Sequence, residues 1–271
     1  MIDIENYYAK LGLEYDPFLK NSKDVFVDTP ESREVMSRLE YLQKIKGFGL
    51  LTGEPGVGKT TCIRNWCKGL SPTLYKVIYS SLSTVTVQEF YRHLAMGLGA
   101  SPAYHKVENF HRIQDEITRY TLEKRITPVI IIDEADHMSG KILSDLKILF
   151  NFEMDSKDRA IVLLTGLPLL NNTLRLSAHE AVRQRIIMNY NMQSLDKIHG
   201  KEYIQKKLST AGGVQDLFDD ASVEAILNAS SGRPRMINRI CSQCLLIAGS
   251  SDDREISPNT VMKAVNDMEL G

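Results

Sequence analysis

Short apolar runs alternate with amphipathic segments along the chain up to about residue 190. The apolar runs predict strands just before Gly53 and near residues 73–81, 129–132, 160–165 and 186–190. Apolar positions with helical spacing follow the first run and recur near residues 86–98, 110–125, 140–150 and 169–184. This alternation predicts an α/β fold in which helices cover a mostly parallel sheet of five strands.

From about residue 195 only helical periodicity remains. The segments that carry it read KIHGKEYIQKKLSTAG, ASVEAILNASS, RPRMINRICSQCLLIAG and SPNTVMKAVNDM. A chain of 271 residues can hold one large domain and a small appended one. We therefore expect an N-terminal linker and helix at residues 1–46, an α/β domain at 47–192 and a small all-helical lid at 193–271.

The first strand runs into GEPGVGKTT, which has the spacing of a phosphate-binding loop between a strand and a helix. Glycines in such a loop let backbone N–H groups converge on phosphates, and the lysine reaches the β and γ oxygens. The hydroxyl of Thr60 is expected to ligate Mg²⁺. The residues predicted to bind ATP are Gly53, Glu54, Pro55, Gly56, Val57, Gly58, Lys59, Thr60 and Thr61.

The apolar run at residues 129–132 ends in Asp133 and Glu134. An aspartate at the tip of a strand beside a phosphate loop can hold Mg²⁺ through its water shell. The adjacent glutamate can polarise the attacking water. The pair therefore favours an enzyme that hydrolyses ATP to ADP and phosphate over a protein that only binds the nucleotide.

The same stretch, Asp133-Glu134-Ala135-Asp136, also spells the motif of the DEAD-box helicases. Those helicases need two lobes of the same type, and the chain after Asp133 is too short for a second one. They also carry a Ser-Ala-Thr triplet after the next strand, which here reads IVLLTGLP. We therefore expect Ala135 and Asp136 to carry no helicase function.

The charges of the chain nearly cancel, with 33 basic and 34 acidic side chains and a pI of about 6.6. This balance excludes a protein that wraps phosphate over its whole surface, although a local basic stripe remains compatible with it. No apolar run reaches the ~20 residues that span a bilayer, and the acidic, aromatic opening is unlike a signal peptide, so a cytoplasmic location is expected. Cys241 and Cys244 have a zinc-like spacing but no second ligand pair, so we interpret them as core thiols.

The order of these features resembles that of the AAA+ ATPases. It combines a phosphate loop, an acidic strand, a polar strand tip, an arginine before the fifth strand and an arginine in a helical lid. Within them the chain is similar to the group of ExeA, TniB and TnsC, to which MuB and IstB are related in function. The opening YYAKLGLEYDPF, the later FVDTPESREVMSRLEYLQ and the lid sequence SSGRPRMINRIC carry this narrower resemblance, which covers about residues 5–265.

The resemblance implies catalytic roles for residues outside the loop. Thr165, at the end of IVLLTG, takes the place of the sensor-one residue that positions the water, the alternative being a strand-end threonine bonded to the backbone. Arg185, immediately before the fifth strand, takes the place of an arginine finger that reaches the γ-phosphate of a neighbouring subunit. Arg183 and Arg175 are the alternatives for that role.

The resemblance also implies contacts from the lid and the linker. Arg235 in GRPR matches sensor two, an arginine that senses the γ-phosphate and couples the lid to the nucleotide state. Arg233 or a simple helix cap is the alternative. Phe18 and Val27 are candidates for contacts with adenine, or else belong to the core.

An arginine finger in trans implies a homo-oligomer, either a ring or a helical filament. The transposition regulators of this group polymerise on duplex DNA with ATP and recruit a transposase, whereas ExeA couples ATP to secretion or envelope assembly. The secretion proteins continue into a transmembrane segment and a peptidoglycan-binding region, neither of which is found in this sequence. We therefore favour the hypothesis of a role in transposition. A switch that gates protein interactions without DNA is a further alternative.

Two loops are candidates for largely sequence-nonspecific contacts with DNA. One, residues 80–86, offers the hydroxyls of Ser83 and Thr84, and the other, residues 102–112, offers His105, Lys106 and Arg112. Phosphate contacts of this kind make binding dependent on salt, and an array of subunits adds many weak contacts. The lysines near residues 197–207 alternate with acidic residues and predict a solvated helix face.

Overall fold

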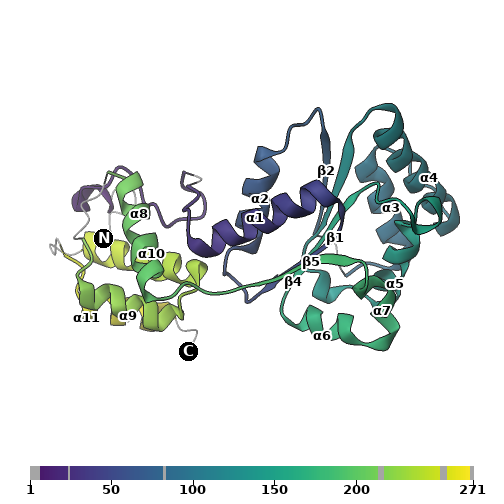
Figure 1. The fold of residues 1–271 in the computed structure, drawn as a ribbon. Coiled ribbons are helices and arrows are strands. Elements are labelled where there is room, and N and C mark those ends of the chain that lie inside the picture. The colour runs from purple at the N-terminus through teal and green to yellow at the C-terminus, as the bar shows by residue number, and fades with distance from the viewer. Residues whose placement is uncertain (1–6, 24, 82–83, 213–216, 251–254, 269–271) are drawn as a thin grey trace. The chain divides into compact units, whose positions relative to one another are not determined.

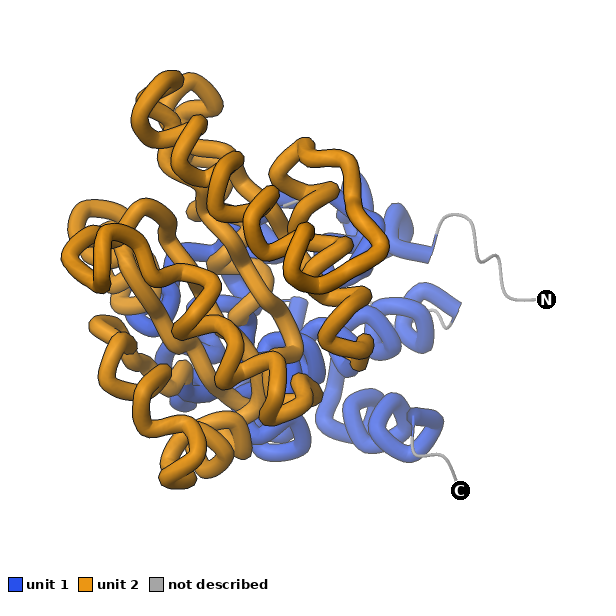
Figure 2. The backbone as a smooth tube through the Cα atoms, turned by 90° about the vertical axis from the view of Figure 1, so that its right-hand side faces the viewer, with its two compact units in different colours: residues 1–33, 55–58, 193–271 blue, residues 34–54, 59–192 orange. Residues whose placement is uncertain are grey.

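The computed structural model describes residues 7–23, 25–81, 84–212, 217–250 and 255–268. The chain divides into two compact units, which Figure 2 distinguishes by colour. Unit 2 comprises residues 34–54 and 59–192, and unit 1 comprises residues 1–33, 55–58 and 193–271. Each unit has its own hydrophobic core.

Unit 2 is built on a five-stranded parallel sheet with the order β2-β3-β4-β1-β5. Its strands are β1 (Gly47–Gly53), β2 (Tyr75–Ser80), β3 (Thr127–Ile132), β4 (Ile161–Gly166) and β5 (Ile186–Met192). Each strand overlaps the apolar run that predicted it, so the α/β class and the parallel sheet are confirmed. The inner strands β1, β3 and β4 are buried throughout, because helices cover both faces of the sheet.

The helices of unit 2 form a layer on each face of this sheet (Figure 1). Most of α1 and all of α2 lie on one face, and α3 to α7 lie on the other. The bounds are α1 (Pro30–Ile45), α2 (Lys59–Gly69), α3 (Val87–Leu98), α4 (Lys106–Thr118), α5 (Gly140–Leu149), α6 (Leu169–Arg175) and α7 (Glu180–Arg183). The close fit of α1 requires Gly49, because a Cβ there would lie 2.4 Å from a methyl carbon of Leu42.

The helix predicted at residues 169–184 is interrupted. Leu176 adopts an extended conformation that ends α6, and a single turn, η5 (Ser177–His179), precedes α7. His179 is 5 % exposed, and its Nδ1 lies 3.3 Å from the hydroxyl of Ser144 on α5. The interruption thus turns a polar side chain toward α5, which apolar periodicity alone does not reveal.

Unit 1 is helical, as expected for the C-terminal region. It contains α8 (Lys197–Thr210), α9 (Asp220–Ser230), α10 (Pro234–Ser250), α11 (Pro258–Met268) and the short turn η1 (Ala9–Leu11). Cys241 and Cys244 lie in its core, where burial raises the pKa of both thiols, that of Cys244 to about 12. No helix in the described part of either unit is long and apolar enough to cross a bilayer.

The N-terminal segment belongs to the core of unit 1. Tyr7 and Phe18 are buried there among residues of the C-terminal helices. Asp16, 2 % exposed, accepts hydrogen bonds from the hydroxyls of Tyr7 at 2.7 Å and Ser242 at 2.6 Å and from the N–H of Phe18 at 2.8 Å. Lys207, 8 % exposed, donates to the Pro17 carbonyl at 2.9 Å. These bonds tie the opening of the chain to α8 and α10.

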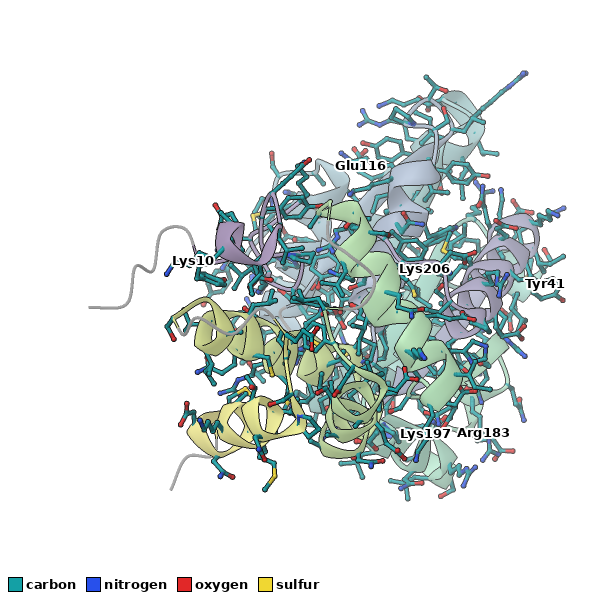
Figure 3. All side chains as sticks on the ribbon, turned by 90° about the vertical axis from the view of Figure 1, so that its left-hand side faces the viewer. Lys10, Tyr41, Glu116, Arg183, Lys197 and Lys206 are labelled. Atoms are coloured by element: carbon teal, nitrogen blue, oxygen red, sulfur yellow. The ribbon has the colours of Figure 1, made fainter. Side chains whose placement is uncertain are left out.

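The lysines of α8 have specific partners within unit 1. Lys197 and Lys201 each lie 2.6 Å from a carboxylate on α9, and Lys206 donates to the carbonyl of Asp28 at 3.1 Å. Figure 3 labels Lys197 and Lys206 on this helix. The prediction of a solvated face therefore holds least for Lys207, whose buried amine has a structural role.

Candidate nucleotide site

The phosphate-binding loop connects β1 to α2. Gly56 and Gly58 have φ angles of 82° and 117°, which residues with side chains rarely adopt. The Lys59 amine donates to the carbonyl of Gly53 at 2.6 Å and to that of Glu54 at 3.1 Å. A positive charge therefore lies at the N-terminus of α2, where free backbone N–H groups also favour phosphate.

Asp133, one residue beyond β3, lies at the carboxyl edge of the sheet. Its Oδ2 accepts hydrogen bonds from the hydroxyls of Thr60 at 3.1 Å and Tyr79 at 2.7 Å. Its Oδ1 accepts one from the N–H of Glu134 at 3.0 Å. Partial burial of the phenol and its hydrogen bond to Asp133 raise the pKa of Tyr79. Thr60 and Asp133 are the pair expected from the sequence, whereas no sequence motif points to Tyr79.

The donors around Asp133 fit a divalent cation. The residue is only 6 % exposed, yet the groups that bond to its carboxylate within the described chain are all neutral. Burying a carboxylate without a positive partner is costly. Thr60 and Asp133 supply the hard oxygen ligands that Mg²⁺ prefers, so a cation held by both would provide the missing charge.

Glu134 combines exposure with an unusual backbone. Its φ and ψ angles are 55° and 37°, a left-handed conformation that is strained for a residue with a side chain. The residue is exposed to solvent, unlike its neighbour Asp133. The turn therefore sends two adjacent carboxylates into different surroundings, one buried on the donors of the loop and one open to water.

Asp136, the last letter of the DEAD stretch, has a structural role. Its side chain is 4 % exposed, and its Oδ1 accepts a hydrogen bond from the N–H of Leu167 at 2.9 Å. Gly166 leaves room for this contact, because a Cβ there would lie 2.3 Å from the same oxygen. The carboxylate thus fixes the turn that follows β4.

Thr165 follows Leu164, which pairs with Ile132 in the parallel register of β3 and β4. Thr165 and Asp133 therefore occupy neighbouring positions at the carboxyl edge. Thr165 is fully buried, and its hydroxyl has no hydrogen-bond partner among the described residues. An unpaired buried hydroxyl is uncommon and marks a position that suits a water or a ligand oxygen.

A polar network that the sequence analysis missed joins three elements at the same edge. The buried Thr52 near the end of β1 donates to Asn191 Oδ1 on β5 at 3.1 Å and accepts from Asn171 Nδ2 on α6 at 2.8 Å. These bonds fix the end of β1 immediately before the phosphate loop. No motif signals such a network, because its members lie far apart in the sequence.

Arg185 is largely buried in unit 2. Its side chain is 12 % exposed, and Nη1 donates to the carbonyls of Lys147 and Phe150, each at 3.2 Å. It also forms an ion pair with Asp155. Burial lowers the pKa of this guanidinium. Arg185 therefore caps the C-terminal end of α5 within its own subunit.

Arg183 is the more exposed of the two candidate fingers. Its side chain is 45 % exposed, and its Nη2 lies 3.9 Å from a carboxylate oxygen of Glu180. Its Nη1 donates to the Arg175 carbonyl at 3.3 Å. Figure 3 labels this side chain. These contacts are long and exposed, so they hold the guanidinium weakly.

Arg235 opens α10 in unit 1. Its backbone N–H donates to the carbonyl of Gly56 at 3.1 Å, and a Cβ on Gly56 would lie 2.7 Å from the Arg235 Cβ. Arg233, its alternative, donates through Nε to the carbonyl of Ser230 at 3.2 Å and so caps α9. Of the two residues, Arg235 is the one beside the glycine of the loop.

The two candidates for adenine contacts lie in unit 1. Phe18 is 4 % exposed and packs edge-on against Phe218, with the ring centroids 6.4 Å apart. Val27 is partly buried against the same core. Both side chains contribute to this core, which is the alternative that the sequence left open.

Residues 42–174 match the model of a protein family described as "AAA domain". The chain contains an AAA domain. The general secretion pathway protein A of Aeromonas hydrophila is 30 % identical over 255 residues, which cover 92 % of this chain and 46 % of that protein. The Mu-like prophage FluMu DNA transposition protein B of Haemophilus influenzae is 30 % identical over 143 residues, which cover 53 % of this chain and 47 % of that protein.

Solved structures share the fold of this AAA-domain protein. Cdc6p from Pyrobaculum aerophilum superposes with a TM-score of 0.72 at 15 % identity, over 94 % of this chain and 71 % of that one. The chain spans about half the length of the curated relatives it matches. The relatives include both kinds of protein expected from the sequence, so the resemblance to the ExeA and MuB relatives is confirmed.

The residues proposed to contact DNA differ in their exposure and in whether their side chains have partners within the AAA domain. Ser83 lies outside the described residues, whereas Thr84 and His105 are exposed. Lys106 lies 2.5 Å from a carboxylate oxygen of Asp145, and its amine lies 5.1 Å from the ring centroid of Tyr91. Arg112 donates to the carbonyl of Ser101. Lys106 and Arg112, the lysine and arginine proposed for the second loop, therefore already have partners within the domain.

Hydrogen bonds hold the second candidate loop in place beside α3. The side chain of Gln88, in the first turn of α3, donates to the carbonyl of Tyr104 just before α4. The fully buried Asn109 accepts from the N–H of Ala103 at 2.7 Å and donates to the carbonyls of Ala103 at 3.0 Å and His105 at 3.2 Å. The segment before α4 is thus held by Asn109 and linked to α3 by Gln88, and Tyr104 within it is 75 % exposed.

Proposed function

We propose that the protein is an ATPase that assembles into a ring or filament on duplex DNA and acts in the selection of targets for DNA transposition. The observation that carries the ATPase proposal is the meeting of Thr60 and Asp133 at 3.1 Å, with the exposed Glu134 next in sequence. One buried carboxylate for a cation beside one open carboxylate for water is an arrangement that hydrolysis needs and simple binding does not.

In this proposal each residue of the site has one task. The loop from Gly53 to Thr61 and the Lys59 amine hold the phosphates, and Thr60 and Asp133 hold Mg²⁺. The cation, when bound, neutralises charge on the phosphate oxygens. Glu134 accepts hydrogen bonds from the attacking water and polarises it. Thr165 orients this water through the hydroxyl that lacks a partner in the described chain.

Arg183 is proposed as the residue that completes the site of a neighbouring subunit. It is 45 % exposed, whereas Arg185 is 12 % exposed and bonded to α5. A guanidinium that leaves weak surface contacts loses less binding energy than one that leaves two partly buried carbonyls. Arg235 acts as the lid sensor, which its bond to the loop residue Gly56 supports.

The loops before α3 and α4 are proposed to contact DNA. They offer the exposed Thr84 and His105 as donors and the exposed ring of Tyr104. These groups can touch phosphate and sugar without reading base sequence. The nearly neutral chain would then depend on many subunits binding one duplex. A transposase is the proposed partner of that assembly, by analogy with the relatives named for DNA transposition.

A second candidate function is an ATPase for secretion. The observation in its favour is that general secretion pathway protein A matches over 92 % of this chain, against 53 % for the transposition protein. In that case ATP would drive assembly without DNA, and the surface around Tyr104 would face a protein partner.

Negative-stain electron microscopy distinguishes the two candidates. The protein is imaged with ATP, with ADP and with a slowly hydrolysed ATP analogue, each with and without duplex DNA. We expect rings or filaments with ATP or the analogue and DNA, and their loss with ADP. Raising the salt concentration should weaken DNA binding to the extent that cationic side chains neutralise phosphates, because such contacts release counterions.

A double variant in which alanine replaces both Thr84 and His105 tests the DNA contacts and leaves the nucleotide site unchanged. This variant should bind nucleotide normally and assemble poorly on DNA. Assembly and ATP turnover that are indifferent to DNA in the unaltered protein would contradict the transposition proposal and favour the secretion candidate.

A further inference from the structure

The hydroxyl of Tyr79 is hydrogen-bonded to the carboxylate of Asp133, which is proposed to hold the cation. In the register of β2 and β3, Tyr79 pairs with Ile131, two residues before Asp133. Side chains at alternate positions point to the same face of a sheet, so Tyr79 and Asp133 share a face. The phenol donates to Asp133 Oδ2 at 2.7 Å, the shortest of the described bonds to this carboxylate.

The three bonds fix both oxygens of Asp133. Oδ1 is held by the N–H of Glu134, and Oδ2 is shared by the hydroxyls of Thr60 and Tyr79. Glu134 and Thr60 belong to the proposed machinery through their sequence motifs. Tyr79 has no such motif, and it is the member of the set without an assigned task.

Packing does not explain the position of this ring. β2 is an edge strand, and Tyr79 is 48 % exposed, whereas the neighbouring Ile78 is 4 % exposed in the core. A half-exposed ring whose hydroxyl points to a buried carboxylate is placed for the hydrogen bond rather than for burial of apolar area.

We propose that Tyr79 is a positioning residue that orients the Asp133 carboxylate for a divalent cation. The inference rests on the proposed ATPase function, because it assigns a role within the same site. Hydrogen bonds that orient a metal-binding carboxylate are typically worth about 10- to 100-fold in metal affinity. Tyr79 acts through Asp133 and does not itself need to touch the cation or the nucleotide.

The test replaces Tyr79 with phenylalanine, which removes one oxygen and keeps the ring. Binding of a fluorescent ATP analogue is followed while Mg²⁺ is titrated, so that cation affinity is read without turnover. We expect the half-saturating Mg²⁺ concentration to rise by about 10-fold or more. Turnover should recover at saturating Mg²⁺, and the melting temperature without nucleotide should stay unchanged. Tyr75→Phe, on the same strand and away from Asp133, is the matched control and should behave like the unaltered protein.

The outcomes separate this inference from the proposed function. If nucleotide binding by the unaltered protein depends on Mg²⁺ and Tyr79→Phe gives the same titration curve, the role of Tyr79 is overturned and the proposed ATPase function is not. A lower melting temperature without a shift in Mg²⁺ dependence would also overturn it, because Tyr79 would then be a structural residue. Nucleotide binding and turnover that need no Mg²⁺ in the unaltered protein would overturn the cation site and the ATPase proposal together.

Discussion

Arg183→Ala is expected to lower the ATP turnover of the assembled protein by about 10³-fold or more, the range measured for arginine fingers. The exposed guanidinium contributes little to the fold, so the melting temperature should not change. Phosphate release is measured at protein concentrations that saturate assembly. Arg185→Ala is the control, and it should lower the stability by about 1–3 kcal/mol because two partly buried carbonyls lose their donor.

A mixing experiment tests whether the finger acts in trans. Lys59→Ala removes the phosphate-binding amine but keeps Arg183, so neither variant alone should turn over ATP. In a mixture, an Arg183→Ala subunit that binds ATP can be completed by the arginine of a Lys59→Ala neighbour, and part of the activity should return. Loss of turnover in Arg185→Ala at an unchanged melting temperature, with normal turnover in Arg183→Ala, would instead assign the finger to Arg185.

Glu134→Gln should reduce hydrolysis by about 10²- to 10⁴-fold, the usual contribution of a general base. The amide keeps the shape of the side chain but cannot polarise water in the same way. Asp133 and Thr60 are unchanged, so ATP should still bind and the ATP-bound assembly should accumulate. Single-turnover hydrolysis and sedimentation in ATP measure the two effects separately.

The control for this variant is Glu40→Gln, an exposed substitution on α1 that should leave turnover and assembly unchanged. If Glu134→Gln abolishes assembly and nucleotide binding instead, Glu134 has a structural role, and its strained backbone serves the fold rather than the reaction.

The sequence predicted the strands well because most of them are continuous apolar runs, two of which end in recognisable polar motifs. The phosphate loop and the pair Asp133-Glu134 follow from local spacing, which survives any arrangement of the rest of the chain. The helix predicted at residues 169–184 was wrong in its continuity, because Leu176 is extended and the chain beyond it brings His179 into contact with α5. Periodicity carries no information about such a contact.

The choice between Arg183 and Arg185 shows why parts of the site escape sequence analysis. Both residues lie in one short stretch before β5, and only the position of the α5 carbonyls distinguishes a buried arginine from an exposed one. Tyr79 escapes for a related reason. It lies inside an apolar strand, and the register of β2 against β3 is what brings its hydroxyl to Asp133.

The bonds of Asp16 have a consequence for how this protein can be shortened. Cutting the chain just before α1 would remove Tyr7, Leu11, Leu13 and Phe18 from the core of the C-terminal helices and leave Ser242 without its acceptor. Exposed apolar surface of that kind promotes aggregation. A shortened fragment should therefore keep residues 7–18, which supply this part of the core and the bond from Tyr7 to Asp16.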